Sequence, residues 1–203
     1  MTTAAGHAEP AGHVQIPQLR TERLLLRSFR DADLDAMAAI GADPEVMRYL
    51  GDGRTLDRED TWRQMAMFVG HWSLRGFGNW AVQELNSGAY VGRVGLHYPE
   101  GWPDRELGWV LGREHWGKGY ATEAARAVLD HAFGTLGWPR TISLIYRDNA
   151  RSVRVAERLG ARLEGQATIR GHTADVYVIV REAWRLRASC GDRTSRAGRC
   201  PSG

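Results

Sequence analysis

Hydrophobic positions between residues 19 and 186 repeat with two periods, one typical of strands and one typical of helices. The clearest stripe spans residues 121–136, where apolar side chains recur at i, i+3, i+4, i+7 and i+8 and predict an amphipathic helix. Further helices are predicted over residues 34–40, 57–74 and 149–159, each preceded or begun by an Asp or Asn that can cap it. One face of the helix over 57–74 is expected to carry Trp62, Met65, Ala66, Val69 and Trp72.

Shorter runs rich in β-branched and aromatic residues predict seven strands. They cover residues 24–29, 80–85, 90–98, 106–111, 141–146, 162–169 and 173–180. Turn-forming segments at residues 86–88 and 99–104 separate three of them, which indicates an antiparallel meander. Because strands and helices do not alternate strictly, the order βααβββαβαββ predicts an α/β (α+β) domain with a mixed sheet of about seven strands and about four helices, and not a doubly wound dinucleotide fold.

The composition is that of one ordinary folded domain. The chain has 203 residues, of which 43% are hydrophobic and 25% charged. Residues 1–18 and 187–203 lack periodicity, so we predict two disordered tails around a domain at 19–186. No run approaches the roughly 20 apolar residues of a membrane span, and the first residues lack a signal-peptide pattern, so we expect a cytoplasmic protein that does not act at a membrane.

The formal net charge of +3 is confined to the C-terminal tail. Residues 187–203 contain four arginines and one aspartate, which leaves the rest of the chain neutral. A neutral domain offers no basic stripe to a phosphate backbone, so nucleic acid is not expected as a partner. Both cysteines, Cys190 and Cys200, lie in the same tail, so the domain has neither a disulfide nor a catalytic cysteine, and no metal site is predicted.

The segment Trp-Gly-Lys-Gly-Tyr-Ala-Thr at 116–122 lies between the strand at 106–111 and the clearest helix. The first backbone N–H groups of a helix have no intrahelical partner, and two glycines allow a ligand to approach them closely, so this segment predicts a pyrophosphate site to which Lys118 adds a charge. Gly-x-x-x-x-Gly-Lys-Ser/Thr is absent, and Thr122 occupies the third glycine position of Gly-x-Gly-x-x-Gly. Nucleoside triphosphates and NAD are therefore not predicted ligands.

Four motifs in sequence order resemble those of the GNAT superfamily of acyl-CoA-dependent N-acetyltransferases, in particular the branch similar to the ribosomal-protein-alanine N-acetyltransferases. They are Thr-Glu-Arg-Leu at 21–24, Glu-Leu-Gly-Trp-Val-Leu at 106–111, Trp-Gly-Lys-Gly-Tyr-Ala-Thr-Glu-Ala at 116–124, and Asn-x-x-Ser at 149–152 followed by Glu-Arg-Leu-Gly at 157–160. The resemblance covers roughly residues 20–185 and implies a GNAT-type, mostly antiparallel sheet.

The resemblance implies acetyl-CoA as a cosubstrate. The residues that it assigns to cofactor binding are Trp109, Val110, Leu111, Gly117, Lys118, Gly119, Tyr120, Ala121, Thr122, Asn149 and Ser152. A backbone N–H of the strand at 109–111 would also face the thioester oxygen, where a fixed donor stabilises developing negative charge. A plain helix N-cap is the alternative role of Asn149 and Ser152.

Two residues are candidates for catalysis. Glu106 matches a glutamate found in this branch of the family and is the candidate general base, directly or through water, with a salt bridge at the sheet edge as its alternative role. Many members carry a tyrosine four residues before the helix-ending glycine, where this chain has Ala156. Ser152 is therefore the candidate that protonates the leaving thiolate, with Tyr120 or a water as alternatives. His97 and Trp102 have two open roles, in the acceptor cleft or in packing.

The sequence thus predicts an N-acetyltransferase that moves an acetyl group from acetyl-CoA to a primary amine, on a protein N-terminus or a small molecule, by direct attack. A non-catalytic acyl-CoA-binding regulatory module is the alternative, and Ala156 is the feature that favours it. The identity of the acceptor and the oligomeric state, a homodimer included, stay open.

Overall fold

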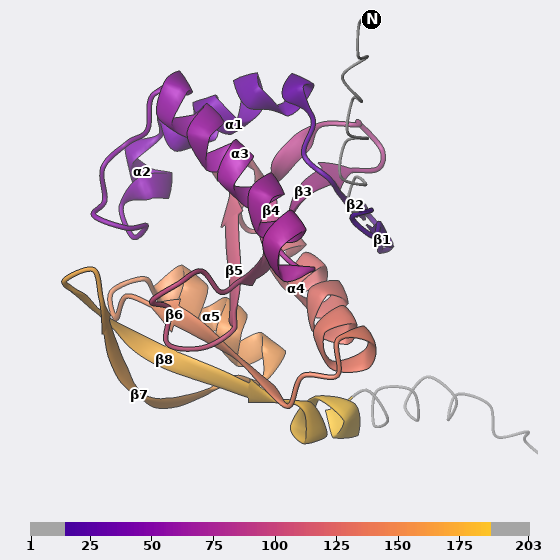
Figure 1. The fold of residues 1–203 in the computed structure, drawn as a ribbon, viewed down its shortest axis with the longest axis vertical. Coiled ribbons are helices and arrows are strands. Elements are labelled where there is room, and N and C mark those ends of the chain that lie inside the picture. Colours follow the sequence, from indigo (N-terminus) through magenta and orange to yellow (C-terminus); the bar gives the residue numbers. More distant parts are fainter. Residues whose placement is uncertain (1–14, 188–203) are drawn as a thin grey trace, which may run out of the picture.

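The computed structural model of the protein describes residues 15–187, and Figure 1 shows one twisted sheet with helices on both faces. The sheet has eight strands in the order β1-β2-β3-β4-β5-β6-β8-β7. Their bounds are β1 (Leu19–Arg20), β2 (Leu24–Arg27), β3 (Asn79–Glu84), β4 (Tyr90–His97), β5 (Glu106–Leu111), β6 (Arg140–Ile145), β7 (Arg162–Ile169) and β8 (His172–Val180). All seven predicted strands are present, and the predicted meander is β3-β4-β5. The eighth strand, β1, has two residues and is too short to carry a pattern.

Figure 1 labels the main helices α1 to α5. They are α1 (Leu34–Gly41), α2 (Pro44–Met47), α3 (Arg58–Arg75), α4 (Tyr120–Asp130) and α5 (Ala150–Leu159). Residues 181–187 are helical as well, and π-helical turns at His131–Thr135 continue α4. The sequence pattern predicted four of these helices and missed residues 181–187 and α2. The four residues of α2 make a single turn and show no periodicity.

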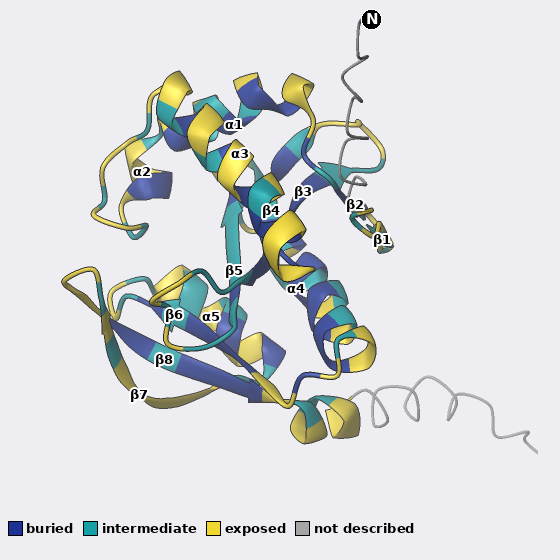
Figure 2. Ribbon diagram, viewed as in Figure 1, coloured by how far each residue is buried: buried dark blue, intermediate teal, exposed yellow. Residues whose placement is uncertain are grey.

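The main core lies between the sheet and α4, as the predicted stripe requires. Six stripe positions are at most 2% exposed: Ala124, Ala125, Val128, Leu129, Ala132 and Phe133. They pack against buried side chains of β3, β4 and β5 such as Trp80, Val94 and Leu107. A second cluster, which includes Phe29, Met37 and Phe68, joins α1 and α3 to the opposite face at Ala81. Figure 2 shows both helix layers buried on their sheet-facing sides.

The buried face of α3 differs from the expected one. Met65 and Trp72 are buried as expected, but Trp62 is 52% and Val69 is 42% exposed, so their assignment to the core is wrong. Phe68 takes the place between the two buried positions, and it stacks on Phe29 with ring centroids 5.7 Å apart. The expected face of α3 and the observed one share Met65 and Trp72. The contact between Phe68 and Phe29 favours the observed face.

β5 and β6 run parallel and separate soon after they meet. Glu106 and Ile142 are their one paired position within the described residues, and the Ser143 hydroxyl donates to the Leu107 carbonyl at 2.7 Å. Main-chain groups two residues apart on a strand point to the same side. Trp109 and Leu111 therefore turn their N–H groups toward the gap between the two strands.

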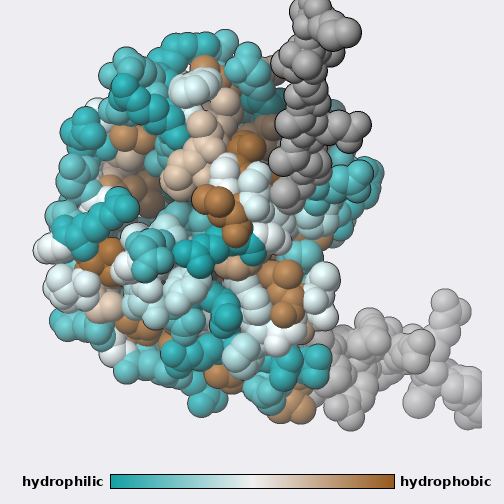
Figure 3. Space-filling view, in the orientation of Figure 1, coloured by the Kyte–Doolittle hydropathy of each residue, from teal (hydrophilic) through white to brown (hydrophobic). Residues whose placement is uncertain are grey.

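The packed part of the chain begins before residue 19. Ile16 packs against the main core, and the Trp80 indole donates to the Pro17 carbonyl at 2.7 Å. The greater part of both predicted tails, with Cys190 and Cys200, lies outside the described residues. Within residues 15–187, no helix has the length and apolar character needed to cross a bilayer. Figure 3 shows hydrophobic side chains scattered among hydrophilic ones on the face in view.

Candidate active site

The loop before α4 contains two glycines in a conformation that glycine favours. Gly117 and Gly119 have φ of 76° and 82°, a left-handed conformation that other residues rarely adopt. Arg23, from the loop before β2, donates to the Lys118 carbonyl at 3.0 Å and forms a salt bridge with Glu123 of α4. These contacts hold the loop against the sheet, with the free N–H groups of the α4 N-terminus beside it.

A cavity of about 1250 Å³ lies over this loop. All eleven residues assigned to cofactor binding line it, together with Arg126, Arg151, Arg154 and Arg158. The Thr122 hydroxyl is buried at its edge and has no hydrogen-bond partner among the described residues. A buried polar atom without a partner is costly, and a ligand oxygen would satisfy it. The residues present therefore fit a large phosphorylated ligand.

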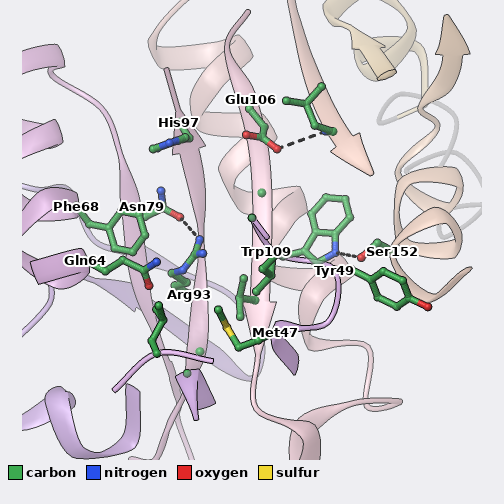
Figure 4. A pocket seen from close by; sticks show the side chains of 18 of the residues that line it. Met47, Tyr49, Gln64, Phe68, Asn79, Arg93, His97, Glu106, Trp109 and Ser152 are labelled. Atoms are coloured by element: carbon green, nitrogen blue, oxygen red, sulfur yellow. Dashed lines mark hydrogen bonds between the residues drawn. The ribbon is translucent and has the colours of Figure 1, made fainter. Parts of the chain in front are cut away.

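A second cavity of about 770 Å³ lies on the opposite face of the sheet, under α1 and α3. Glu106, His97 and Trp102 line it, and so does Arg93 of β4 (Figure 4). The two cavities share Trp109 and Ser152 among their lining residues. They therefore meet where β5 and β6 separate, so a group bound in one can reach a group bound in the other.

Glu106 is the strongest titratable candidate in the second cavity. Its carboxylate accepts from the Trp102 indole at 2.8 Å and from the Leu144 backbone N–H at 3.4 Å. Burial raises the pKa of this carboxyl to about 7, although both hydrogen bonds act in the opposite direction. Glu106 has no salt-bridge partner within residues 15–187, so the alternative of an edge ion pair is wrong for this part of the chain.

Asn149 and Ser152 form the helix cap that was their alternative role, and they also line both cavities. The Asn149 side-chain oxygen accepts from the Ser152 N–H at 3.2 Å at the start of α5. The Ser152 hydroxyl accepts from the Trp109 indole at 3.3 Å, as Figure 4 shows. The hydroxyl oxygen thus has its proton available for another acceptor.

The side chain of His97 lies directly across from Glu106 on β4 and is neutral at neutral pH. Burial and the nearby Arg93 charge lower its pKa to about 4. Its Nδ1 is buried without a partner in the described part of the chain. The Trp102 ring stands edge-on to the His97 ring, with centroids 5.1 Å apart. Trp102 and His97 therefore enclose the Glu106 carboxyl and contribute to its desolvation.

Two other positions bear on the leaving-group acid. The Tyr120 hydroxyl donates to Glu84 of β3, so its proton is already engaged. Ala156 is 1% exposed and packs with Ile145 and Tyr177. Ser152 is thus the hydroxyl at the junction of the two cavities.

Arg93 is a cavity residue that the sequence analysis missed. It lies four residues before His97 on β4, so the two side chains share a face of the sheet. The signal available was an arginine in the middle of the run Val-Gly-Arg-Val-Gly-Leu at 91–96, whose other residues are apolar or glycine. Within the described residues, no group of His, Cys, Asp and Glu side chains is arranged to hold a metal ion.

Comparison with known proteins gives consistent matches. A family model described as an acetyltransferase (GNAT) domain matches residues 23–162. The uncharacterized N-acetyltransferase p20 of Bacillus licheniformis is 30% identical over 167 residues, which cover 79% of this chain and 93% of that protein. An acetyltransferase structure from Agrobacterium tumefaciens is 34% identical, with a TM-score of 0.73 over 86% of this chain and 99% of that one. The RimL ribosomal L7/L12 alpha-N-protein acetyltransferase, solved in complex with coenzyme A, shares the fold at 18% identity, with a TM-score of 0.68 over 81% of this chain and 98% of that one.

Proposed function

The chain belongs to the GNAT family of acetyltransferases, and we propose that it transfers the acetyl group of acetyl-CoA to a primary amine by direct attack. The observation that carries this proposal is the junction of two cavities at Trp109 and Ser152. One cavity contains the glycine loop, and the other contains a half-buried carboxyl whose pKa is about 7. Donor and acceptor would therefore meet through the gap between β5 and β6.

The larger cavity is the proposed acetyl-CoA site. The N–H groups at the start of α4 and the Lys118 ammonium would bind the pyrophosphate, and the unpartnered Thr122 hydroxyl would donate to one of its oxygens. The arginines of α4 and α5 that line the cavity add positive charge for the remaining phosphate. RimL, a protein of the same fold, was solved in complex with coenzyme A, which supports coenzyme A as the kind of ligand.

Glu106 is the proposed general base. At pH 7, removing the proton from an ammonium group costs about 1.2 kcal/mol for an α-amine and about 4.6 kcal/mol for a lysine-like amine. A carboxyl whose pKa is about 7 is a far better proton acceptor at neutral pH than an ordinary glutamate. Glu106 would take the proton of the attacking amine directly or through one water.

In the proposed reaction, the amine nitrogen forms a bond to the thioester carbonyl carbon, and the carbon–sulfur bond breaks. The N–H groups that Trp109 and Leu111 turn toward the gap would stabilise the negative charge on the carbonyl oxygen. The Ser152 hydroxyl would give its proton to the leaving thiolate and regain one from water. The products are the N-acetylated amine and coenzyme A, and Glu106 releases its proton to solvent.

The test is free-thiol release from acetyl-CoA with a panel of primary amines. Glu106→Gln should lower kcat/KM by about 100-fold, the contribution of a positioned base. Glu100→Gln is the matched control, since Glu100 is an exposed carboxylate on the same loop as Trp102. Acetyl-CoA should raise the melting temperature of all three proteins, because ligand binding stabilises the folded state.

Each part of the proposal can fail separately. Full activity of Glu106→Gln would refute the base. No rise in melting temperature would refute the acetyl-CoA site. A rise in melting temperature without thiol release for any amine would favour the non-catalytic acyl-CoA-binding module, for which the buried Ala156 is the structural argument.

A further inference from the structure

The second cavity, which contains Glu106, is called the acceptor cavity from here on. The Arg93 guanidinium lies inside it without a carboxylate partner. It contacts the Asn79 side-chain oxygen at 3.3 Å and lies over the Phe68 ring, 4.7 Å from its centroid. No ion pair to Arg93 occurs within residues 15–187. An arginine stays protonated even where burial lowers its pKa, as it does here. Arg93 is half-buried, and a charge that is partly removed from water is costly unless an anion binds to it.

One face of β4 and β5 forms the floor of the acceptor cavity, and the strand register places Arg93 and Glu106 at opposite ends of it. Arg93 pairs with Val110, Gly95 with Gly108, and His97 with Glu106, so these three rows share one face of the sheet. Rows two residues apart are separated by about 7 Å along the strands. The middle row consists of two glycines, so the two strands place no side chain of their own between Arg93 and Glu106, and the Phe68 ring of α3 covers the Arg93 end.

Gly108 confirms that this floor is open. A Cβ atom added to Gly108 would meet no atom within 4 Å, whereas one added to Gly95 would collide with the Asn79 backbone. Gly95 is therefore required by packing, and Gly108 borders empty space. Figure 4 shows the Arg93 guanidinium turned toward Asn79, with His97 further along the same strand and Glu106 on the neighbouring one.

The other charges in the cavity also favour an anionic group on the acceptor. The arginines that line it are Arg54, Arg93 and Arg170, against the two acids Asp52 and Glu106. Arg54 is already paired with Asp52 and Asp60, at 3.9 and 3.5 Å. Arg170 lies 5.9 Å from the Trp102 ring centroid and forms no ion pair within the described residues. A polyamine or aminoglycoside would bring several positive charges beside Arg93 and Arg170, which opposes binding.

We infer that the acceptor is a small amine that also carries a carboxylate, such as a free amino acid. Its carboxylate pairs with the Arg93 guanidinium, and its amine lies over Gly108 within reach of Glu106. Arginine binds a carboxylate through two parallel hydrogen bonds, which fixes orientation as well as charge. The inference rests on the proposed function and narrows its substrate class.

The experiment compares amino acids with their carboxamides as acceptors. Each pair shares the amine and differs in the carboxylate, and the panel adds Ala- and Ser-starting peptides, spermidine and an aminoglycoside. The wild-type protein should prefer the amino acid in kcat/KM, even though the amine of the amide is easier to deprotonate. Arg93→Gln should lower kcat/KM for the amino acid on the order of 10- to 100-fold and leave the amide nearly unchanged. Arg93→Lys should restore part of the loss.

The matched control is Arg54→Gln, because Arg54 lines the same cavity and is already paired. It should leave the preference for the carboxylate intact. Wild-type preference for an amide, a peptide or a polyamine would overturn the inference. So would an Arg93→Gln variant that binds acetyl-CoA normally but loses activity with amino acid and amide equally, since that outcome indicates a packing role.

A binding measurement separates this inference from the proposed function. Trp102 and Trp109 line the acceptor cavity, so tryptophan fluorescence of the coenzyme A-saturated protein reports occupancy. If no amine is acetylated, the proposed function fails. Binding of the amino acid over its amide, lost in Arg93→Gln, would still support the carboxylate site. Equal binding of both, or no binding, would overturn it.

Discussion

Glu106→Gln should stabilise the protein at alkaline pH, because an ionised carboxylate in this cavity costs free energy. Burial raises the pKa of Glu106 from 4.5 to about 7. One pKa unit corresponds to about 1.4 kcal/mol, so ionising the folded protein costs about 3 kcal/mol more than ionising the unfolded chain. Glutamine keeps a side-chain oxygen that can accept from Trp102 and removes the charge.

The sign of the pH dependence follows from proton binding. Between pH 4.5 and about 7 the folded protein binds the Glu106 proton more tightly than the unfolded chain, so wild-type stability falls as pH rises through this window. The variant lacks this loss. Its advantage in unfolding free energy should grow by about 2 to 3 kcal/mol from pH 5 to pH 8, or roughly 5 to 10 °C in Tm.

Urea or thermal unfolding of the wild type and of Glu106→Gln across this pH range tests the reasoning. Other titrating groups, His97 included, are present in both proteins, so their contribution cancels in the difference. Glu100→Gln should leave the shape of the stability curve unchanged, because Glu100 is exposed. A difference between wild type and Glu106→Gln that stays constant from pH 5 to pH 8 would refute the desolvated carboxyl.

Three further predictions address the cavities and the core. Gly108→Val should lower kcat/KM about 10-fold or more by filling the floor of the acceptor cavity, with no loss of Tm, and steady-state kinetics beside thermal unfolding would show it. Gly119→Ala and Gly88→Ala, both at positive φ, should each cost about 1 kcal/mol of stability, but calorimetry should find weaker acetyl-CoA binding for Gly119→Ala alone. Asp33→Asn breaks the buried ion pair with Arg27 and should cost about 3 to 5 kcal/mol in urea unfolding without changing acetyl-CoA binding.

Local patterns were sufficient to predict the part of the site that one segment builds. The glycine loop and the first turn of α4 are contiguous in sequence, and their shape depends on glycine conformation and on unpaired N–H groups, both readable from residue types. The apolar stripe of α4 is buried as predicted, because all its small and apolar residues lie on the one face of the helix that packs against the sheet. Glu106 was predicted as a base from its resemblance to the family, while its raised pKa depends on burial, which only the folded chain provides.

The sequence could not predict features that depend on contacts between segments far apart in the chain. The buried face of α3 is decided by the stacking of Phe68 on Phe29, two residues far apart in sequence. The contact of Trp109 with Ser152 joins β5 to the start of α5, and no local pattern encodes it. Arg93 shares a face with Glu106 only because β4 and β5 pair at His97 and Glu106, and a shift of one residue would move Arg93 to the α4 side.

The proposed chemistry and the stability of the fold oppose each other. A base for amines at neutral pH needs a desolvated carboxyl, and a carboxylate receptor needs a guanidinium left without an internal partner; each costs free energy in the empty protein. A direct Arg93–Glu106 ion pair would relieve both costs, and it would lower the pKa of Glu106 and occupy Arg93. One row of the sheet, formed by Gly95 and Gly108, separates the two groups in this fold. The acceptor we propose would supply both missing partners, so its binding should raise Tm by more than that of its carboxamide.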